Sequence, residues 1–165
     1  MGNPTHECMP KNPTHTQTPY VTKNGIETTV DANLAFMLEL LKLLGVETYY
    51  SCEENYGKAY VLGNGLDFVR LERKIKKLAK RGYLSRESTK VVKRLFGKKH
   101  TVDISVGRYA KNGRPLFEVY LHLGKHKSCV SKNVHSHHGF RTEWRWPEKK
   151  TSEVSRMLAE VLQFA

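Results

Sequence analysis

The segment from Leu66 to Arg81 places its apolar residues at helical spacing and is mostly basic over the rest of its surface. Gly82 follows as a residue suited to end a helix. Such a helix has one stripe to bury, so it must lie against another layer of structure. The segment therefore predicts a layered fold with one helix face left to solvent. The apolar stripe consists of Phe68, Leu71, Ile75, Leu78 and Ala79.

Three further segments have the same helical pattern with one apolar side. They cover residues 31–44, residues 85–96, and a last helix that begins at about Thr151. Asp31 and Ser85 are residue types that cap the first turn of a helix, so we expect each to cap its own segment. The four helices together predict a fold in which every helix has one buried side.

Five segments have the alternating or β-branched sequence of strands. Asn112-Gly113 is the strongest hairpin signal, because both positions of a type I′ turn take a positive φ. A two-residue turn there places Asp103 directly opposite His122 and Ile104 opposite Leu121. The predicted strands span residues 45–52, 58–62, 102–107, 118–123 and 140–146.

Short connections between these strands favour antiparallel pairing, and helices with a single stripe must cover one face of the sheet. The predicted fold class is α+β, a two-layer sandwich with a mostly antiparallel sheet of about five strands and helices on one face. Residues 1–19 contain the tetrapeptide Asn-Pro-Thr-His twice and no apolar periodicity, which predicts an extended N-terminal arm. Residues 20–165 are predicted as a single α+β domain.

The sequence contains no apolar run near the roughly 20 residues that cross a bilayer and no signal-peptide core, so we expect no membrane partner. Its cysteines, Cys8, Cys52 and Cys129, are odd in number and widely spaced. This pattern predicts free thiols and a reducing, cytoplasmic location. The sequence does not determine whether the chain forms a homo-oligomer.

The formal net charge is +12, and the residues from Arg70 to Lys99 include thirteen Lys or Arg but only two acids, Glu72 and Glu87. Like charges at three- and four-residue steps repel one another unless an anion is bound. We therefore predict a phosphate-binding surface, with an ordinary solvated helix face as the alternative. The predicted phosphate-binding residues are Arg70, Arg73, Lys74, Lys77, Lys80, Arg81, Lys90, Lys93, Arg94, Lys98 and Lys99.

Exposed aromatic side chains can add to nucleic-acid binding, because bases stack on their rings. The alternative is that these rings belong to the core, where strand aromatics are common. The candidates for stacking are Tyr49, Tyr109, Tyr120, Trp144 and Trp146.

A histidine-rich segment follows His122 and invites a metal interpretation, because zinc takes histidine nitrogen and cysteine sulfur. The candidate ligands are Cys129, His135, His137 and His138. Their spacing matches no standard zinc finger, so a loop that binds metal incidentally is the alternative, and we expect no resident cofactor.

For catalysis the sequence offers only the candidates Asp103, His122 and Tyr120 on the predicted hairpin. We favour the alternative that they form a polar pair across two strands on a solvated sheet face. The sequence contains no complete catalytic motif, so we do not expect an enzyme.

The first helix leads into Gly45-Val46-Glu47-Thr48-Tyr49-Tyr50-Ser51-Cys52-Glu53 and a short following strand. Residues 26–62 resemble small uncharacterised bacteriophage and bacterial proteins in which a helix precedes a G-[IV]-x-T-x-x-S-C-[EQ] hairpin. The resemblance implies a phage-type origin, with the host cytoplasm as the location, and marks Thr48, Ser51 and Cys52.

We expect non-enzymatic binding of a phosphate-rich partner, either nucleic acid or an anionic nucleotide, by a phage-type accessory protein. One alternative is a counter-defence protein that sequesters a nucleotide immune signal. The other is a metal-dependent nuclease or phosphodiesterase.

Overall fold

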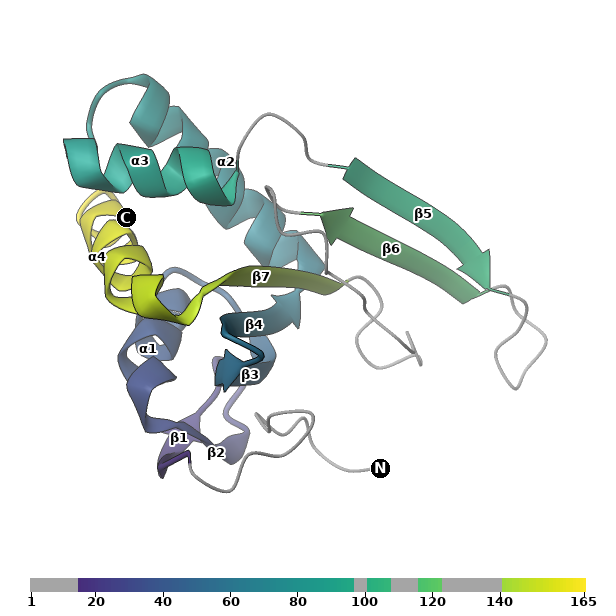
Figure 1. The fold of residues 1–165 in the computed structure, drawn as a ribbon. Coiled ribbons are helices and arrows are strands. Elements are labelled where there is room, and N and C mark those ends of the chain that lie inside the picture. The colour runs from purple at the N-terminus through teal and green to yellow at the C-terminus, as the bar shows by residue number, and fades with distance from the viewer. Residues whose placement is uncertain (1–14, 97–100, 108–115, 123–140) are drawn as a thin grey trace.

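The computed structural model in Figure 1 describes residues 15–96, 101–107, 116–122 and 141–165, and from 101 to 122 it describes the course of the backbone only. The first half contains β1 (Gln17–Val21), β2 (Glu27–Asp31), a 3-10 turn (Ala32–Leu34), α1 (Ala35–Leu43), β3 (Thr48–Asn55), β4 (Lys58–Asn64) and α2 (Gly65–Lys80). The second half contains α3 (Arg86–Leu95), β5 (Thr101–Gly107), β6 (Leu116–His122), β7 (Arg141–Pro147), a second 3-10 turn (Glu148–Lys150) and α4 (Thr151–Leu162).

The α+β class is confirmed, but the single five-stranded sheet is wrong. The described strands form three antiparallel sheets, β1-β2, β3-β4-β7 and β5-β6. In Figure 1, α1, α3 and α4 gather beside the three-stranded sheet, and the β5-β6 hairpin extends away from it. β7 pairs with β4, so a strand from late in the chain completes the sheet that the β3-β4 hairpin begins.

The core lies where this three-stranded sheet meets the helices. Trp144 of β7 is fully buried, and its ring centroid lies 4.8 Å from that of Phe68 and 5.2 Å from that of Phe96. Trp146 is buried as well, and its indole Nε1 donates to the Thr151 hydroxyl over 2.9 Å. Because Phe68 comes from α2 and Phe96 ends α3, the β7 tryptophan fixes both helices against the sheet.

The close approach of α2 to the sheet depends on Gly63 in β4. A Cβ atom at this position would lie 2.5 Å from the Glu47 carbonyl oxygen and 2.7 Å from the Phe68 ring. Both distances are far below van der Waals contact, so only glycine fits between the β3 backbone and α2 without a shift.

The chain begins its described part with a hairpin that the sequence did not predict. β1 starts at Gln17, inside the range predicted as an extended arm, and pairs along its length with β2. The Tyr20 hydroxyl of β1 donates to the Leu38 carbonyl of α1 over 2.9 Å, and burial raises the pKa of Tyr20 to about 12. This buried contact attaches the N-terminal hairpin to the first helix.

The predicted β5-β6 hairpin is confirmed, but its register is wrong by two residues. Asp103 lies opposite Tyr120 rather than His122, and Ile104 lies opposite Val119 rather than Leu121. A shift by two keeps each residue on its predicted face, because side chains alternate with a period of two. The loop that sets this register lies outside the described residues.

Helix boundaries follow the sequence closely. α2 and α3 each begin and end within one residue of the prediction, and α4 begins at Thr151 as expected. Asp31 is an exception to the predicted capping, because its side chain makes no cap hydrogen bond. Within the described residues, no helix combines the length and apolar character needed to cross a membrane.

Candidate functional site

α2 is held in place at its first turn by two polar contacts. The Asn64 side chain caps the helix by accepting from the Asp67 backbone N–H over 3.1 Å. The Asp67 carboxylate in turn accepts from the Glu47 backbone N–H over 3.0 Å. The start of the helix is therefore fixed to the chain that enters β3, and its apolar stripe packs inward as predicted.

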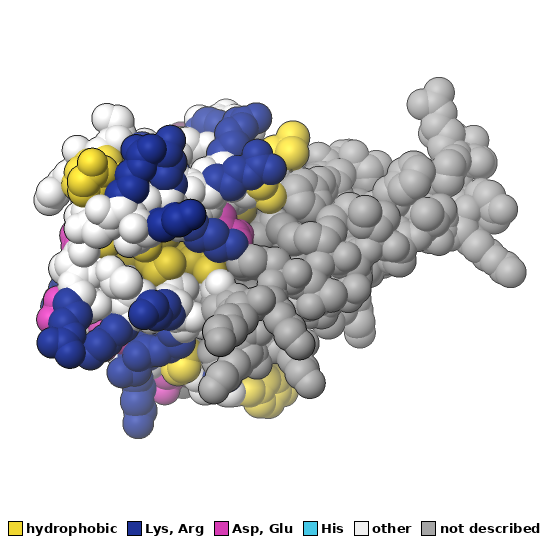
Figure 2. All heavy atoms as spheres, turned by 90° about the horizontal axis from the view of Figure 1, so that it is seen from above, with side chains coloured by type: hydrophobic (Ala, Val, Ile, Leu, Met, Phe, Trp, Pro, Cys, Tyr) yellow, Lys and Arg dark blue, Asp and Glu magenta, His cyan; other side chains and the backbone are white. Residues whose placement is uncertain are grey.

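The opposite side of α2 is basic and turns outward. At 3.6 residues per turn, the basic residues from Arg70 to Arg81, Lys76 apart, lie within about 120° of arc. α3 continues this surface with exposed basic residues of its own. Figure 2 looks onto this side and shows Lys and Arg side chains over α2 and α3, with uncharged and hydrophobic atoms and some Asp or Glu side chains between them.

We name this surface the α2–α3 basic face, and define it by the cations that have no acidic partner among the described residues. Arg70, Lys76 and Arg94 are excluded, because they pair with Asp67 at 3.6 Å, Glu72 at 3.1 Å and Glu153 at 3.1 Å. Seven of the members are exposed and Lys74 is half-buried. The members are Arg73, Lys74, Lys77, Lys80, Arg81, Arg86, Lys90 and Lys93.

Seven of these eight members were predicted as phosphate-binding, five from Arg73 to Arg81 and two, Lys90 and Lys93, on α3. Arg86 was missed. Arg86 follows the cap residue Ser85, and at helical spacing it lies on the same side as Lys90 and Lys93. Lys98 and Lys99 lie outside the described residues.

The start of α3 is fixed by a carboxylate from α4. Glu160 accepts from the Ser85 backbone N–H over 2.7 Å, from the Ser85 hydroxyl over 2.8 Å, and from the Ser88 hydroxyl. Burial pushes the pKa of Glu160 upward, but these hydrogen bonds outweigh it, so the pKa lies below its usual value. The ionised carboxylate therefore holds α3, and its basic side chains, against α4.

Three of the residues predicted to stack on bases are buried instead. Trp144 and Trp146 are 0% and 1% exposed, and Tyr49 is 7% exposed. The two tryptophan rings belong to the main hydrophobic core. All three rings are buried, so they are not available to a ligand at the surface. Tyr109 lies outside the described residues, as does the side chain of Tyr120.

A different pair of aromatic rings is exposed. Tyr83, in the turn between α2 and α3, is 55% exposed, and Phe164 near the C-terminus is 45% exposed. The two rings stack with their centroids 5.6 Å apart and their planes 12° from parallel. Tyr83 comes two residues after Arg81, so this pair borders the α2–α3 basic face. Sequence reasoning missed it because a lone tyrosine after a helix-ending glycine has no distinctive pattern.

The other predicted candidates cannot be placed. Cys129, His135, His137 and His138 lie outside the described residues. Asp103, His122 and Tyr120 lie on β5 and β6, where the backbone alone is described.

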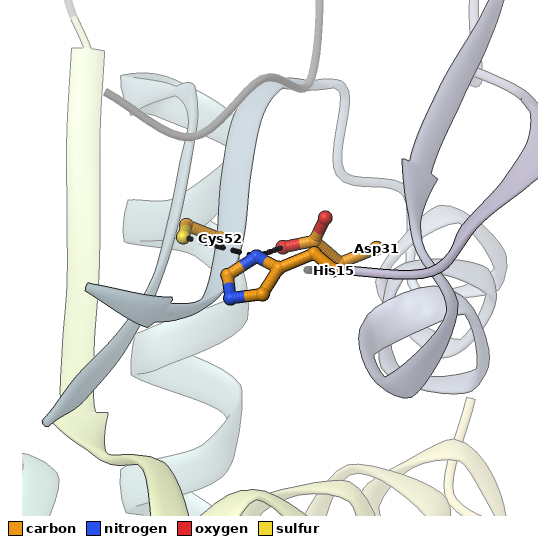
Figure 3. A group of neighbouring side chains, drawn as sticks. All are labelled: His15, Asp31 and Cys52. Atoms are coloured by element: carbon orange, nitrogen blue, oxygen red, sulfur yellow. Dashed lines mark hydrogen bonds and ion pairs between the residues drawn. The ribbon is translucent and has the colours of Figure 1, made fainter. Parts of the chain in front are cut away.

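A second group of functional side chains lies at the other end of the described chain. His15 precedes β1, Asp31 ends β2, and Cys52 and Glu53 lie on β3. The His15 Nδ1 atom is 3.0 Å from Asp31 Oδ2, 4.0 Å from Cys52 Sγ and 4.0 Å from Glu53 Oε1. Figure 3 shows the imidazole ring between the side chain of Cys52 and the Asp31 carboxylate. We name these four residues the Asp31 cluster.

Asp31 is fully buried, and its carboxylate is well supplied with donors. Its Oδ2 atom accepts from the Glu53 backbone N–H over 2.8 Å, and its Oδ1 atom accepts from the Gln17 side chain. Gln17 is the strand partner of Asp31, so the pairing of β1 with β2 positions this donor. These bonds explain why Asp31 does not cap the following helix, as its sequence position had predicted.

Cys52 is fully buried and disulfide-bonded. The other cysteines of the chain, Cys8 and Cys129, both lie outside the described residues. The prediction of a free thiol is therefore wrong for Cys52, which also weakens the argument from cysteine count for a reducing compartment.

The Asp31 cluster contains a cysteine, a histidine and an aspartate but lacks the geometry of a nucleophilic triad. A triad needs the aspartate on one imidazole nitrogen and the nucleophile on the other. Here Asp31 and Cys52 both approach Nδ1, and Figure 3 shows Nε2 directed away from both. The arrangement is unsuited to covalent catalysis, whereas several donors converging on one point is the arrangement of a ligand site.

A cavity of about 830 Å³ adjoins the Asp31 cluster. His15 and Glu53 line it, together with Phe36 of α1 and Arg156 of α4. The histidine and one carboxylate of the cluster therefore border a space large enough for small solutes to enter.

No protein-family model matches the chain, and neither a curated protein nor a solved structure matches it.

Proposed function

We propose that this protein binds single-stranded nucleic acid through the α2–α3 basic face. The observation that carries the proposal is a set of eight cations on two adjacent helices, none of which has an acidic partner among the described residues. Scattered or internally paired lysines would have argued for a solvated surface without a ligand.

The charge arrangement favours an extended polyanion. α2 is about 24 Å long, so its basic side spans several successive phosphates of a nucleic-acid strand. Neighbouring cations at three- and four-residue steps repel one another in the free protein, and bound phosphates relieve that repulsion. Release of the counterions that surround the strand adds a favourable entropy to the same contacts.

The Tyr83–Phe164 pair favours a single strand over a duplex. Both rings are exposed at the border of the α2–α3 basic face, where an unpaired base can stack on them. The bases of a duplex already stack on one another, so they offer no free face to these rings. Duplex DNA is therefore expected to bind through phosphates alone and with lower affinity.

The test compares two double charge reversals by fluorescence anisotropy with a labelled single-stranded oligonucleotide. Arg73→Glu/Lys77→Glu changes the α2–α3 basic face, and Lys23→Glu/Lys149→Glu makes the same change in net charge elsewhere on the exposed surface. We expect the first variant to bind weakly and to lower the salt slope of binding by about two, and the second to keep most of the affinity.

Equal losses in the two variants would show that net charge alone governs binding and would overturn the proposed face. Unchanged binding in the first variant would do the same.

For strand selectivity, Tyr83→Ala is expected to reduce the preference for single-stranded over double-stranded DNA, and an unchanged preference would remove the stacking role.

A further inference from the structure

We propose that the Asp31 cluster is a binding site for a divalent transition-metal ion of the zinc class, and that it becomes able to bind the ion when the disulfide at Cys52 is reduced. The donors would be His15 Nδ1, Asp31 Oδ2 and Cys52 Sγ, with Glu53 Oε1 as the fourth. This site is independent of the α2–α3 basic face and of nucleic-acid binding.

The spacing of the donors agrees with one small ion at their centre. The ligand atoms of His15, Asp31 and Cys52 all lie within 4.8 Å of one another. Zinc bond lengths in a tetrahedron require the nitrogen and oxygen to be about 3.4 Å apart and the nitrogen and sulfur about 3.6 Å apart. The observed separations are 3.0 Å and 4.0 Å. A change of about 0.4 Å in each distance would bring both to the values of a tetrahedral zinc site.

The chemistry of the donors selects the metal. One thiolate, one imidazole and carboxylate oxygens suit zinc and cobalt(II), whereas magnesium and calcium prefer oxygen ligands alone. The His15 nitrogen that faces the centre is the one that faces Asp31, so Nδ1 must give up any proton to bind metal, and Nε2 then carries the N–H.

The surrounding hydrogen bonds are those of a site held in advance. The Glu53 N–H and the Gln17 amide orient the Asp31 carboxylate, and Asp31 itself is fully buried. Partners of this kind fix the direction of a metal ligand and raise its affinity. The cavity lined by His15 and Glu53 gives the ion a route from solvent.

Redox state would control the site because the sulfur of a disulfide is not a thiolate. A dithiol reductant supplies two electrons to the S–S bond of Cys52, which breaks to give two thiols, and the reductant closes to its own disulfide. The Cys52 thiol then releases its proton to water as it binds the ion. The oxidised protein is therefore expected to bind the metal weakly and the reduced protein tightly.

The competing explanation is that these residues form only a hydrogen-bonded connection between β1, β2 and β3. The test adds cobalt(II) alone to the full chain, before and after reduction with a dithiol that is then removed. We expect the reduced protein to gain tetrahedral d–d bands and a thiolate-to-cobalt charge-transfer band. The oxidised protein should show no charge-transfer band, and zinc should displace the cobalt.

Variants identify the ligands. Cys52→Ser should abolish the charge-transfer band, while Cys129→Ser is the matched cysteine control and should keep it. Glu53→Gln replaces a charged ligand and should weaken cobalt binding by at least the roughly 10–100-fold that loss of an outer hydrogen-bond partner costs, whereas Glu54→Gln, one residue along the same strand, should have little effect.

Circular dichroism of each variant checks that it is folded. If Cys52→Ser does not fold, His15→Ala tests the same metal site by removing a different ligand. Absence of the band in reduced wild-type protein would overturn the site. So would a band that persists in Cys52→Ser or in His15→Ala, because the histidine-rich segment that follows His122 would then explain the binding.

Discussion

The α2–α3 basic face and the Asp31 cluster differ in the burial of their charged groups and in whether those groups have partners. Eight cations of the face stand in or near solvent with no acidic partner among the described residues. The carboxylate of Asp31 is fully buried and receives hydrogen bonds from a backbone N–H and from the side chain of Gln17, with His15 beside it. Uncompensated surface charge leaves attraction available to a partner, whereas compensated buried charge organises the protein itself.

The two regions also differ in how the chain assembles them. The face comes from two consecutive helices and lies between residues 73 and 93. The Asp31 cluster joins residue 15, which precedes β1, with residue 31 at the end of β2 and residues 52 and 53 on β3. Changes in the first region should alter binding with little effect on folding, and changes in the second should do the reverse.

The largest expected effect is the response of nucleic-acid binding to salt. If six to ten phosphates of a single strand are contacted, affinity should fall by roughly 300-fold to 10⁴-fold between 50 and 200 mM salt, because releasing counterions is less favourable at high salt. Cobalt(II) affinity of the reduced protein should change far less, because Asp31 and Cys52 of the cluster are fully buried. Anisotropy and absorbance titrations at matched salt concentrations make the comparison, and parallel salt responses would contradict it.

The next effect is on folding stability. Asp31→Ala leaves the donors of Gln17 and the Glu53 backbone without their acceptor, and should lower the free energy of unfolding by about 3 kcal/mol. Lys77→Ala should change it by no more than about 0.5 kcal/mol, because this side chain is exposed and has no acidic partner in the described part of the chain. Urea denaturation of the oxidised protein measures both, and similar losses in the two variants would remove the distinction between the regions.

Glu160 connects folding to the basic face, because its carboxylate holds the start of α3. Glu160→Gln should lower stability at neutral pH by about 1–2 kcal/mol. The pKa of Glu160 lies below its usual value in the folded protein, so the folded state favours the ionised form. The stabilisation is therefore present above the ordinary glutamate pKa and lost as pH falls through the folded-state pKa. Urea denaturation from neutral to acid pH should show the two proteins converging, and a constant difference would exclude the mechanism.

The smallest effect concerns Arg94, which pairs with Glu153 across α3 and α4. Burial pushes the pKa of Glu153 upward, but hydrogen bonds and positive charge from Arg94 and Lys150 outweigh it and lower that pKa. The pair is exposed, so Arg94→Gln should change stability by only about 0–1 kcal/mol. The salt slope for oligonucleotide binding by Arg94→Gln should stay near that of the wild-type protein, whereas Lys90→Gln should lower the slope by about one. A larger change for Arg94→Gln would add this residue to the binding face.

The sequence predicted the helices well, and the reason is local. Residues three or four apart on α2 share a side of the helix whatever else the chain does, so the apolar stripe and the basic arc could both be seen in advance. Asn64 as a cap, the exposed Tyr83–Phe164 pair and the role of Arg86 were missed. The two-residue error at Asp103 has a different origin, because register depends on a turn whose length one dipeptide does not determine.

What the sequence determined by itself is the position of charge along α2 and α3, since helical periodicity converts spacing directly into a surface. Tertiary structure alone decided that Trp144 and Trp146 are core residues, since their burial depends on β7 pairing beside β4. It also decided that Asp31 faces His15 and Cys52 rather than capping a helix. These contacts join residues 16 to 37 positions apart, and packing, not local spacing, selects which distant side chains meet.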